Sequence, residues 1–105
     1  MKDFRKMVLD MREAQKALRK NSRNEIYEKR VRAAEAEVDS FLKQHLRDGE
    51  KGTFKGKVKD MRDTQKLFFS RKRTDIVKKL LGMAEKDVDE ELKGYVKSQQ
   101  QQTLF

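Results

Sequence analysis

The sequence has 105 residues, 43% of them charged, and its 27 basic and 18 acidic side chains give a net charge of +9. It contains no cysteine, which excludes disulfides and thiolate metal sites. No apolar run approaches the roughly 20 residues of a membrane span, and the N-terminus lacks the apolar core of a secretory signal. We therefore expect a small cytoplasmic protein with no membrane role, whose charge suits a polyanion such as DNA or RNA.

The first predicted element is a helix that begins at Phe4 and ends near residue 20. A second helix follows a short turn near residues 20–24. In both helices apolar side chains recur four and three residues apart, which is typical of helices packed on a neighbour. We call these positions the seam of each helix, and the polar Gln15 and His45 continue the same spacing. The seam positions are Phe4, Val8, Met11, Gln15 and Leu18, then Tyr27, Val31, Ala34, Val38, Phe41 and His45.

The linker "RDGEKGT" is the one clear loop, and the same pattern follows it at an offset of 50 residues. Sixteen of the 44 residues in 4–47 are identical to those in 54–97, where chance would give roughly three. The phrase "DMREAQK" thus recurs as "DMRDTQK". In the second unit, four more residues are expected to widen the apolar face: Leu67, Phe69, Leu80 and Leu92.

Polar side chains mark the start of each predicted helix. Asp3 and Thr53 precede the first helix of each unit, and Asn24 and Thr74 precede the second. Their oxygens can accept hydrogen bonds from free backbone amides. Ser22 with Glu25 offers a competing capping box for the second helix.

The pattern predicts an all-α fold built from two tandem helical hairpins, which we expect to cover each other as an antiparallel four-helix, up-down-up-down bundle with a pseudo-two-fold axis. The bundle would be one domain over residues 1–97, with hairpin repeats 1–47 and 53–97 and a linker at 48–52. The alternative is two hairpins held apart, each pairing with another chain, so a monomer and a homodimer both remain open.

In an antiparallel hairpin, facing residues have roughly constant summed numbers. Phe4 is expected to face Phe41, and Met11 to face the small Ala34. The same register brings oppositely charged residues together as exposed ion pairs, each worth on the order of 0.2–1 kcal/mol. These pairs are Arg12 with Glu35 and Arg62 with Glu85.

Gln15 and Gln65 are polar members of the apolar seam. They could hydrogen-bond to each other across the bundle and so specify its register. Alternatively, Ala14 and Thr64 turn inward and the glutamines lie at the rim. Gly82, inside the fourth helix, either permits a close helix approach or is only tolerated there.

Basic residues gather at the two tight turns, which the expected topology places at one end of the bundle. The opposite end is mixed to acidic. A basic end can contact nucleic-acid phosphates without reading sequence, and no aromatic side chain interleaves with it as a stacking platform. The candidate nucleic-acid-binding residues are Arg19, Lys20, Arg23, Arg71, Lys72 and Arg73.

The sequence offers no catalytic site, cofactor motif or metal-ligand set. His45 is the only histidine and continues a helix seam, where a packing or rim role is expected. Di-metal helical bundles use Glu-x-x-His pairs, but Leu42 stands where that glutamate would be. There is no phosphate-binding glycine loop either. We therefore predict a protein that is not an enzyme and has no cofactor.

The helix pattern ends at Lys97, and residues 98–105 are expected to form a flexible tail. Its last five residues, "QQTLF", resemble the bacterial sliding-clamp-binding peptide, in which a Gln is followed by two variable residues and Leu-Phe. The resemblance implies that Gln101 hydrogen-bonds at the clamp's cleft while Leu104 and Phe105 fill its apolar pocket. Gln102 departs from the more usual aliphatic residue.

Together these features predict a small helical accessory protein that contacts nucleic acid through its basic end and is recruited to replication or repair machinery by its tail. The alternative is a protein-interaction or oligomerisation module whose charges serve only solubility. Salt-dependent binding to nucleic acid would favour the first function, and self-association without it would favour the second.

Overall fold

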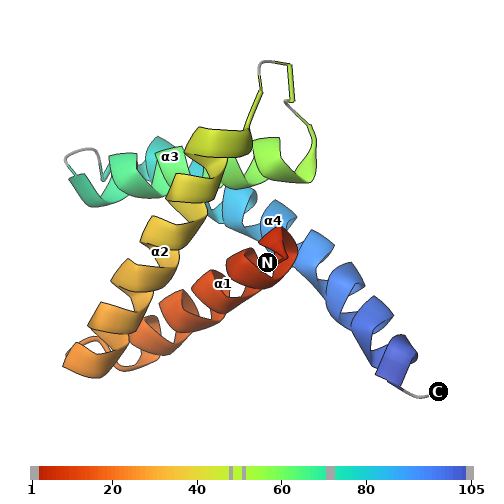
Figure 1. The fold of residues 1–105 in the computed structure, drawn as a ribbon. Helices are drawn as coiled ribbons and strands as arrows, with labels where there is room; N and C mark the ends of the chain where they lie inside the picture. Colours follow the sequence, from red (N-terminus) through yellow and green to blue (C-terminus); the bar gives the residue numbers. More distant parts are fainter. Residues whose placement is uncertain (1–2, 48, 51, 71–72, 104–105) are drawn as a thin grey trace. The chain divides into compact units, whose positions relative to one another are not determined.

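The structure, a computed structural model, describes residues 3–47, 49–50, 52–70 and 73–103, the last four by their backbone alone. These residues form four α-helices in chain order (Figure 1). No helix among them is long and apolar enough to cross a membrane. The helices are α1 (Phe4–Lys20), α2 (Glu25–His45), α3 (Phe54–Ser70) and α4 (Asp75–Thr103).

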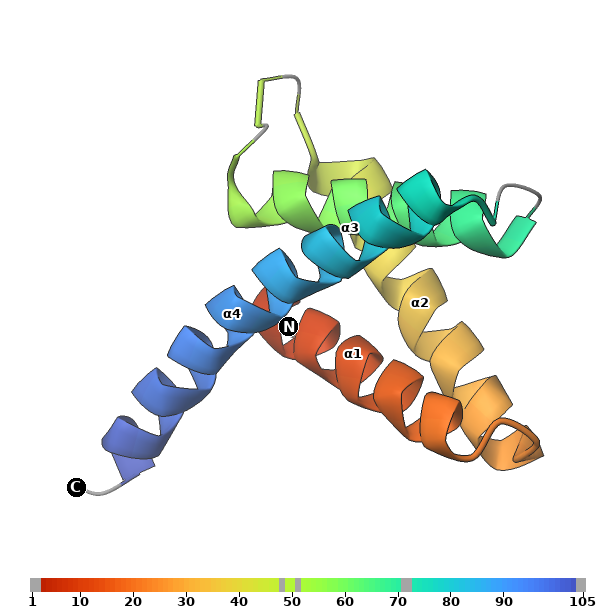
Figure 2. The ribbon, with the colours of Figure 1, turned by 180° about the vertical axis from the view of Figure 1, so that it is seen from behind.

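The chain divides into two compact units, Met1–His45 and Leu46–Phe105. In the first, α1 packs on α2, and in the second α3 packs on α4, each pair running antiparallel around a short turn (Figures 1 and 2). We call these units the first and the second hairpin. The predicted all-α fold of two tandem helical hairpins is confirmed, while the packing of one hairpin on the other stays a prediction.

Side-chain caps explain where the helices begin. Oxygens of Asp3, Asn24, Thr53 and Thr74 each accept a backbone N–H of the following turn, at 3.0 to 3.2 Å. All four predicted caps are therefore confirmed. The competing capping box at Ser22 is not used, because α2 begins directly after Asn24.

The repeated seam forms the core of each hairpin. Met11 and Met61 are fully buried, together with valines at equivalent positions of the two units, whereas Ala34 is only half-buried. At the open end of the first hairpin, the rings of Phe4 and Phe41 stack with centroids 4.4 Å apart, which confirms the predicted register. The valines are Val8, Val38, Val58 and Val88.

The second hairpin is less apolar inside than its sequence suggests. Leu92 is buried, as expected for a residue that widens the apolar face. Leu67, Phe69 and Leu80 are instead exposed, so their predicted place in the core is wrong. Leu67 and Phe69 flank the seam residue Phe68 on α3, and Leu80 precedes the buried Leu81 on α4. The packed face of a two-helix unit is too narrow to include these neighbours of the seam.

The fourth helix is longer than predicted. It runs to Thr103, so residues 98–103 continue the helix instead of forming a flexible tail. Glutamine is a good helix former, and no proline or glycine interrupts this stretch. With 29 residues against the 17 of α3, α4 continues beyond its partner for about 18 Å at 1.5 Å per residue (Figure 2).

Ion pairs hold the linker end of the second hairpin. The Lys57 ammonium donates a hydrogen bond to the Glu91 carboxylate at 2.7 Å, which raises the pKa of Lys57. In the linker, Glu50 accepts the backbone N–H of Arg47 at 3.1 Å and pairs with Lys55 at 3.2 Å. These two partners, the backbone N–H first, lower the pKa of Glu50.

Three glycines allow a test of backbone conformation. Gly49, in the linker, has a φ of +87°, whereas Gly82 lies on the exposed face of α4. An added Cβ at Gly82 would meet no described atom within 4 Å, which favours the alternative in which the helix only tolerates this glycine. Gly94, also in α4, has the same open surroundings.

Substituting these glycines should therefore change stability in opposite directions. Gly82→Ala should raise the free energy of unfolding by about 1 kcal/mol, because alanine is the better helix former. Gly49→Ala should lower it by about 1 kcal/mol, because its φ is unfavourable for an L residue. Urea unfolding of the two variants measures both changes, and a loss of stability in Gly82→Ala would contradict the open surroundings of this position.

Candidate functional site

The turn of the first hairpin is rich in exposed cations. Arg19 and Lys20 occupy the last turn of α1, where positive charge is favoured by the helix dipole, and Arg23 follows in the turn. The backbone N–H of Asn21 closes α1 on the carbonyls of Ala17 and Leu18 at 3.1 and 3.0 Å. The three cations thus lie at the turn of the first hairpin, and the gathering of both basic turns at one end of a bundle stays a prediction.

The turn of the second hairpin places Arg73 beside aromatic rings. Its guanidinium lies 5.9 Å from the centroid of Phe68, and the rings of Phe68 and Phe69 meet edge to face with centroids 5.1 Å apart. Phe69 is 56% exposed, so an aromatic ring does accompany the basic residues here, contrary to expectation. Arg71 and Lys72 lie outside the described residues.

The repeated phrase builds a polar cluster inside each hairpin. In the first, Arg12 Nη1 donates to Gln15 Oε1 at 2.7 Å, and Gln15 Nε2 donates to Glu35 Oε2 on α2 at 2.7 Å. Arg12 and Gln15 are buried, and Glu35 is half-buried. We call these three residues the first polar cluster. The glutamine side chain joins the two helices because its amide both accepts and donates.

The second polar cluster repeats this geometry 50 residues later. Arg62 Nη1 donates to Gln65 Oε1 at 2.6 Å, and Gln65 Nε2 donates to Glu85 Oε2 at 2.7 Å. All three residues are buried. Every buried side-chain nitrogen or oxygen in the described part of the chain has a hydrogen-bond partner, as expected of a polar network that contributes to stability.

These clusters correct two expectations. The pairs of Arg12 with Glu35 and Arg62 with Glu85 were expected to be exposed, but both arginines are buried and a glutamine hydrogen-bonds to both members of each pair. The glutamines themselves are buried, so the alternative that placed them at the rim is wrong. These hydrogen bonds lie within each hairpin, and pairing of the two glutamines across the bundle stays a prediction.

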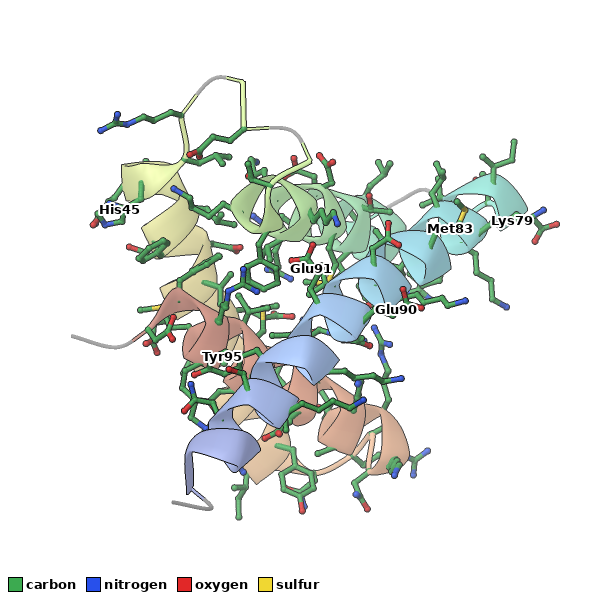
Figure 3. The ribbon with its side chains drawn as sticks, turned by 90° about the vertical axis from the view of Figure 1, so that its right-hand side faces the viewer. His45, Lys79, Met83, Glu90, Glu91 and Tyr95 are labelled. Atoms are coloured by element: carbon green, nitrogen blue, oxygen red, sulfur yellow. The ribbon has the colours of Figure 1, made fainter. Side chains whose placement is uncertain are left out.

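Each polar cluster satisfies its arginine inside the hairpin, because Arg12 and Arg62 are both buried and hydrogen-bonded to a glutamine of their own helix. Among the described residues, no three His, Asp or Glu side chains gather as they would to hold a metal ion. His45, labelled in Figure 3, lies exposed at the end of α2 with its ring centroid 4.4 Å from that of Phe41, which confirms a rim position.

The peptide that resembles a clamp-binding motif falls at the end of the described chain. Gln101 belongs to the last turn of α4, whereas Leu104 and Phe105 lie outside the described residues. The first three residues of the motif are therefore part of α4, which continues beyond α3. The binding residues of the motif stay a prediction.

The sequence matches no protein-family model, and comparisons with curated proteins and with solved structures found no similar chain. The class of this protein is thus defined by its own architecture, which is a duplicated helical hairpin with a buried Arg–Gln–Glu cluster in each copy. Any assignment of function must come from its exposed residues.

Proposed function

We propose that this protein is a small non-enzymatic accessory protein that contacts DNA or RNA through the basic turns of its hairpins, without reading sequence. The observation that carries this proposal is the group of three exposed cations at the turn of the first hairpin, Arg19, Lys20 and Arg23. Arg73 at the second turn is also exposed. The net charge of +9 supports the same proposal.

The chemistry of these residues suits phosphate oxygens. An arginine guanidinium can donate two parallel hydrogen bonds to a phosphate, and a lysine ammonium acts as a point charge. Contacts of this kind release counterions from the nucleic acid and depend strongly on salt. They also carry no base information, because they reach only the sugar-phosphate backbone. Arg71 and Lys72 belong to the proposed interface by their place in the sequence.

We further propose that the C-terminal peptide recruits the protein to replication or repair machinery through a sliding clamp. The support is the resemblance of Gln101, Leu104 and Phe105 to the clamp-binding motif and the position of Gln101 in the last turn of α4, which continues beyond α3. Deleting residues 101–105 should abolish binding to the clamp, measured by surface plasmon resonance. Equal binding of the full and the truncated chain would show that the motif is a coincidence.

Charge reversal at the first turn tests the nucleic-acid contact. The variant carries glutamate at Arg19, Lys20 and Arg23, and the control carries glutamate at three exposed lysines outside both turns, Lys43, Lys93 and Lys97. Both variants have the same net charge. The turn variant should bind duplex DNA or RNA roughly a hundredfold more weakly at low salt, because three cations no longer neutralise phosphates.

The salt dependence of binding supplies a second readout. If each cation neutralises one phosphate, log affinity for duplex DNA should decrease less steeply with log salt concentration. The magnitude of the slope should be smaller by about 0.9 for each cation that is replaced. Fluorescence anisotropy with labelled duplexes measures both quantities. If binding weakens equally in the turn variant and the control, net charge alone explains the effect, and a site at the turn is contradicted. Self-association of the protein without nucleic-acid binding would favour an interaction module.

A further inference from the structure

The second hairpin carries exposed apolar side chains near its turn. Leu67 and Phe69 lie in the last turn of α3, and Ile76, Leu80 and Met83 lie in the first turns of α4. Their exposed fractions run from 42% for Leu67 to 73% for Ile76. The three residues of α4 are spaced four and three apart, so they form one stripe along the helix. Such a patch on a highly charged chain is typical of an interaction surface.

The first hairpin lacks this surface although it is built from the same pattern. At an offset of 50 residues, Leu80 corresponds to Arg30 and Met83 to Ala33. Leu67 and Phe69 likewise correspond to Ala17 and Arg19, and only Ile76 has an equal, Ile26. The core residues of the two hairpins are shared while this surface differs. A hairpin thus folds without the apolar stripe, which points to a role other than folding.

A shallow hollow of about 530 Å³ lies beside the stripe on α4. Gly82 forms its floor, because this residue has no side chain and the space above it is open. Met83 contributes an apolar side, and Figure 3 shows Met83 and Lys79 near one another at the first turns of α4. The surface towards the hollow is almost entirely apolar, and its remaining residues are Asp75 and three lysines: Lys78, Lys79 and Lys86.

We propose that this stripe and hollow, which we call the α4 docking face, bind an acidic amphipathic helix of a partner protein. Aliphatic anchors of the partner would cover Leu80 and Met83 and enter the hollow over Gly82, while its carboxylates would meet the surrounding lysines. Methionine adapts its shape to different partners, which suits such a face. Residues 75–86 span about 17 Å, the length of a docked helix of about eleven residues.

Charge distinguishes this partner from other occupants. Two copies of the chain meeting symmetrically at this face would bring Lys78, Lys79 and Lys86 against their own counterparts, and like charges in contact disfavour that dimer. Nucleic-acid bases stack on aromatic rings, whereas this stripe is aliphatic. An acidic protein helix satisfies both the lysines and the apolar residues.

The test uses the first hairpin as a template for the matched variant. In Leu80→Arg with Met83→Ala, the second hairpin receives the residues that the first hairpin has at these positions, so the fold should be kept. Circular dichroism and urea unfolding should agree with the original chain to within about 0.5 kcal/mol. The probe is a displayed library of randomised helical peptides, selected on the full-length chain.

Enriched peptides should combine Asp or Glu with large aliphatic residues on one helical face and should bind the variant at least about tenfold more weakly. The proposal is overturned if no enriched peptide distinguishes the chain from the variant, or if the enriched peptides are neutral or basic. It is also overturned if the substitutions instead weaken binding to duplex DNA or to vesicles of phosphatidylserine and phosphatidylcholine, or abolish self-association in sedimentation.

Discussion

Gln65→Leu should lower the free energy of unfolding by about 2–4 kcal/mol. The substitution removes two short hydrogen bonds to charged groups, one from Arg62 and one to Glu85. Each such bond is worth about 1.5–3 kcal/mol, and burial of the leucine side chain offsets only part of the loss. Gln65 is only 2% exposed, so water cannot readily replace the missing amide. Urea unfolding followed by circular dichroism measures the change.

A matched control distinguishes the cluster from an ordinary surface pair. Lys59 and Asp63, also on α3, form an ion pair at 2.7 Å with both side chains about half exposed. Lys59→Ala should change stability by less than about 0.5 kcal/mol, because exposed pairs contribute little. If Gln65→Leu proved as mild as this control, the second polar cluster would have no role in holding the hairpin together.

Met61→Ala should be about as costly, with an expected loss of about 2–5 kcal/mol. Met61 is fully buried in the second hairpin, so its truncation removes apolar packing and leaves a cavity. The small size of one hairpin leaves few other residues to fill that space. Thermal unfolding and urea unfolding should both report the loss.

The control for this prediction is another methionine of the same hairpin. Met83 is 61% exposed, so Met83→Ala should change stability by less than about 0.5 kcal/mol. The same substitution contributes to the weaker peptide binding expected at the α4 docking face. Equal destabilisation by the two methionine substitutions would contradict the burial that the structure assigns to Met61 and Met83.

Helix boundaries and hairpin register follow from local chemistry. The caps at Asp3, Asn24, Thr53 and Thr74 depend on one side chain and the next turn of backbone, and both are visible in sequence. The pairing of Phe4 with Phe41 follows from counting back from the turn. Helix caps and contacts across a short turn are predictable because residues close in sequence have few other partners to choose from.

The polar clusters escape prediction because periodicity describes apolar faces. The pattern identifies Gln15 as a polar member of the seam, but it places Arg12, three residues earlier on the same side of the helix, on the surface. A signal is present in the recurrence of Arg and Gln three residues apart, followed by Glu twenty residues later, in both units. Burial of a charge is favourable only when its partners are known, which requires the geometry.

The exposed apolar residues of the second hairpin show a different limit. Leu67, Phe69 and Leu80 are apolar, and composition alone assigns them to a core. The two helices of one hairpin bury only a narrow seam, so these residues remain on the surface. Comparison of the two repeats indicates this outcome. An apolar residue that is present in one hairpin and replaced in the other is not required for a hairpin to fold.

The central claim is that the phrase shared by residues 10–16 and 60–66 holds each hairpin together through its glutamine. A double-mutant cycle between Gln65→Leu and Glu85→Leu tests it most directly, because the bond that joins these residues links α3 to α4. We predict a coupling of at least about 1 kcal/mol in urea unfolding, and a similar value for Gln15 with Glu35. Additive effects, with a coupling below about 0.3 kcal/mol in both hairpins, would contradict it.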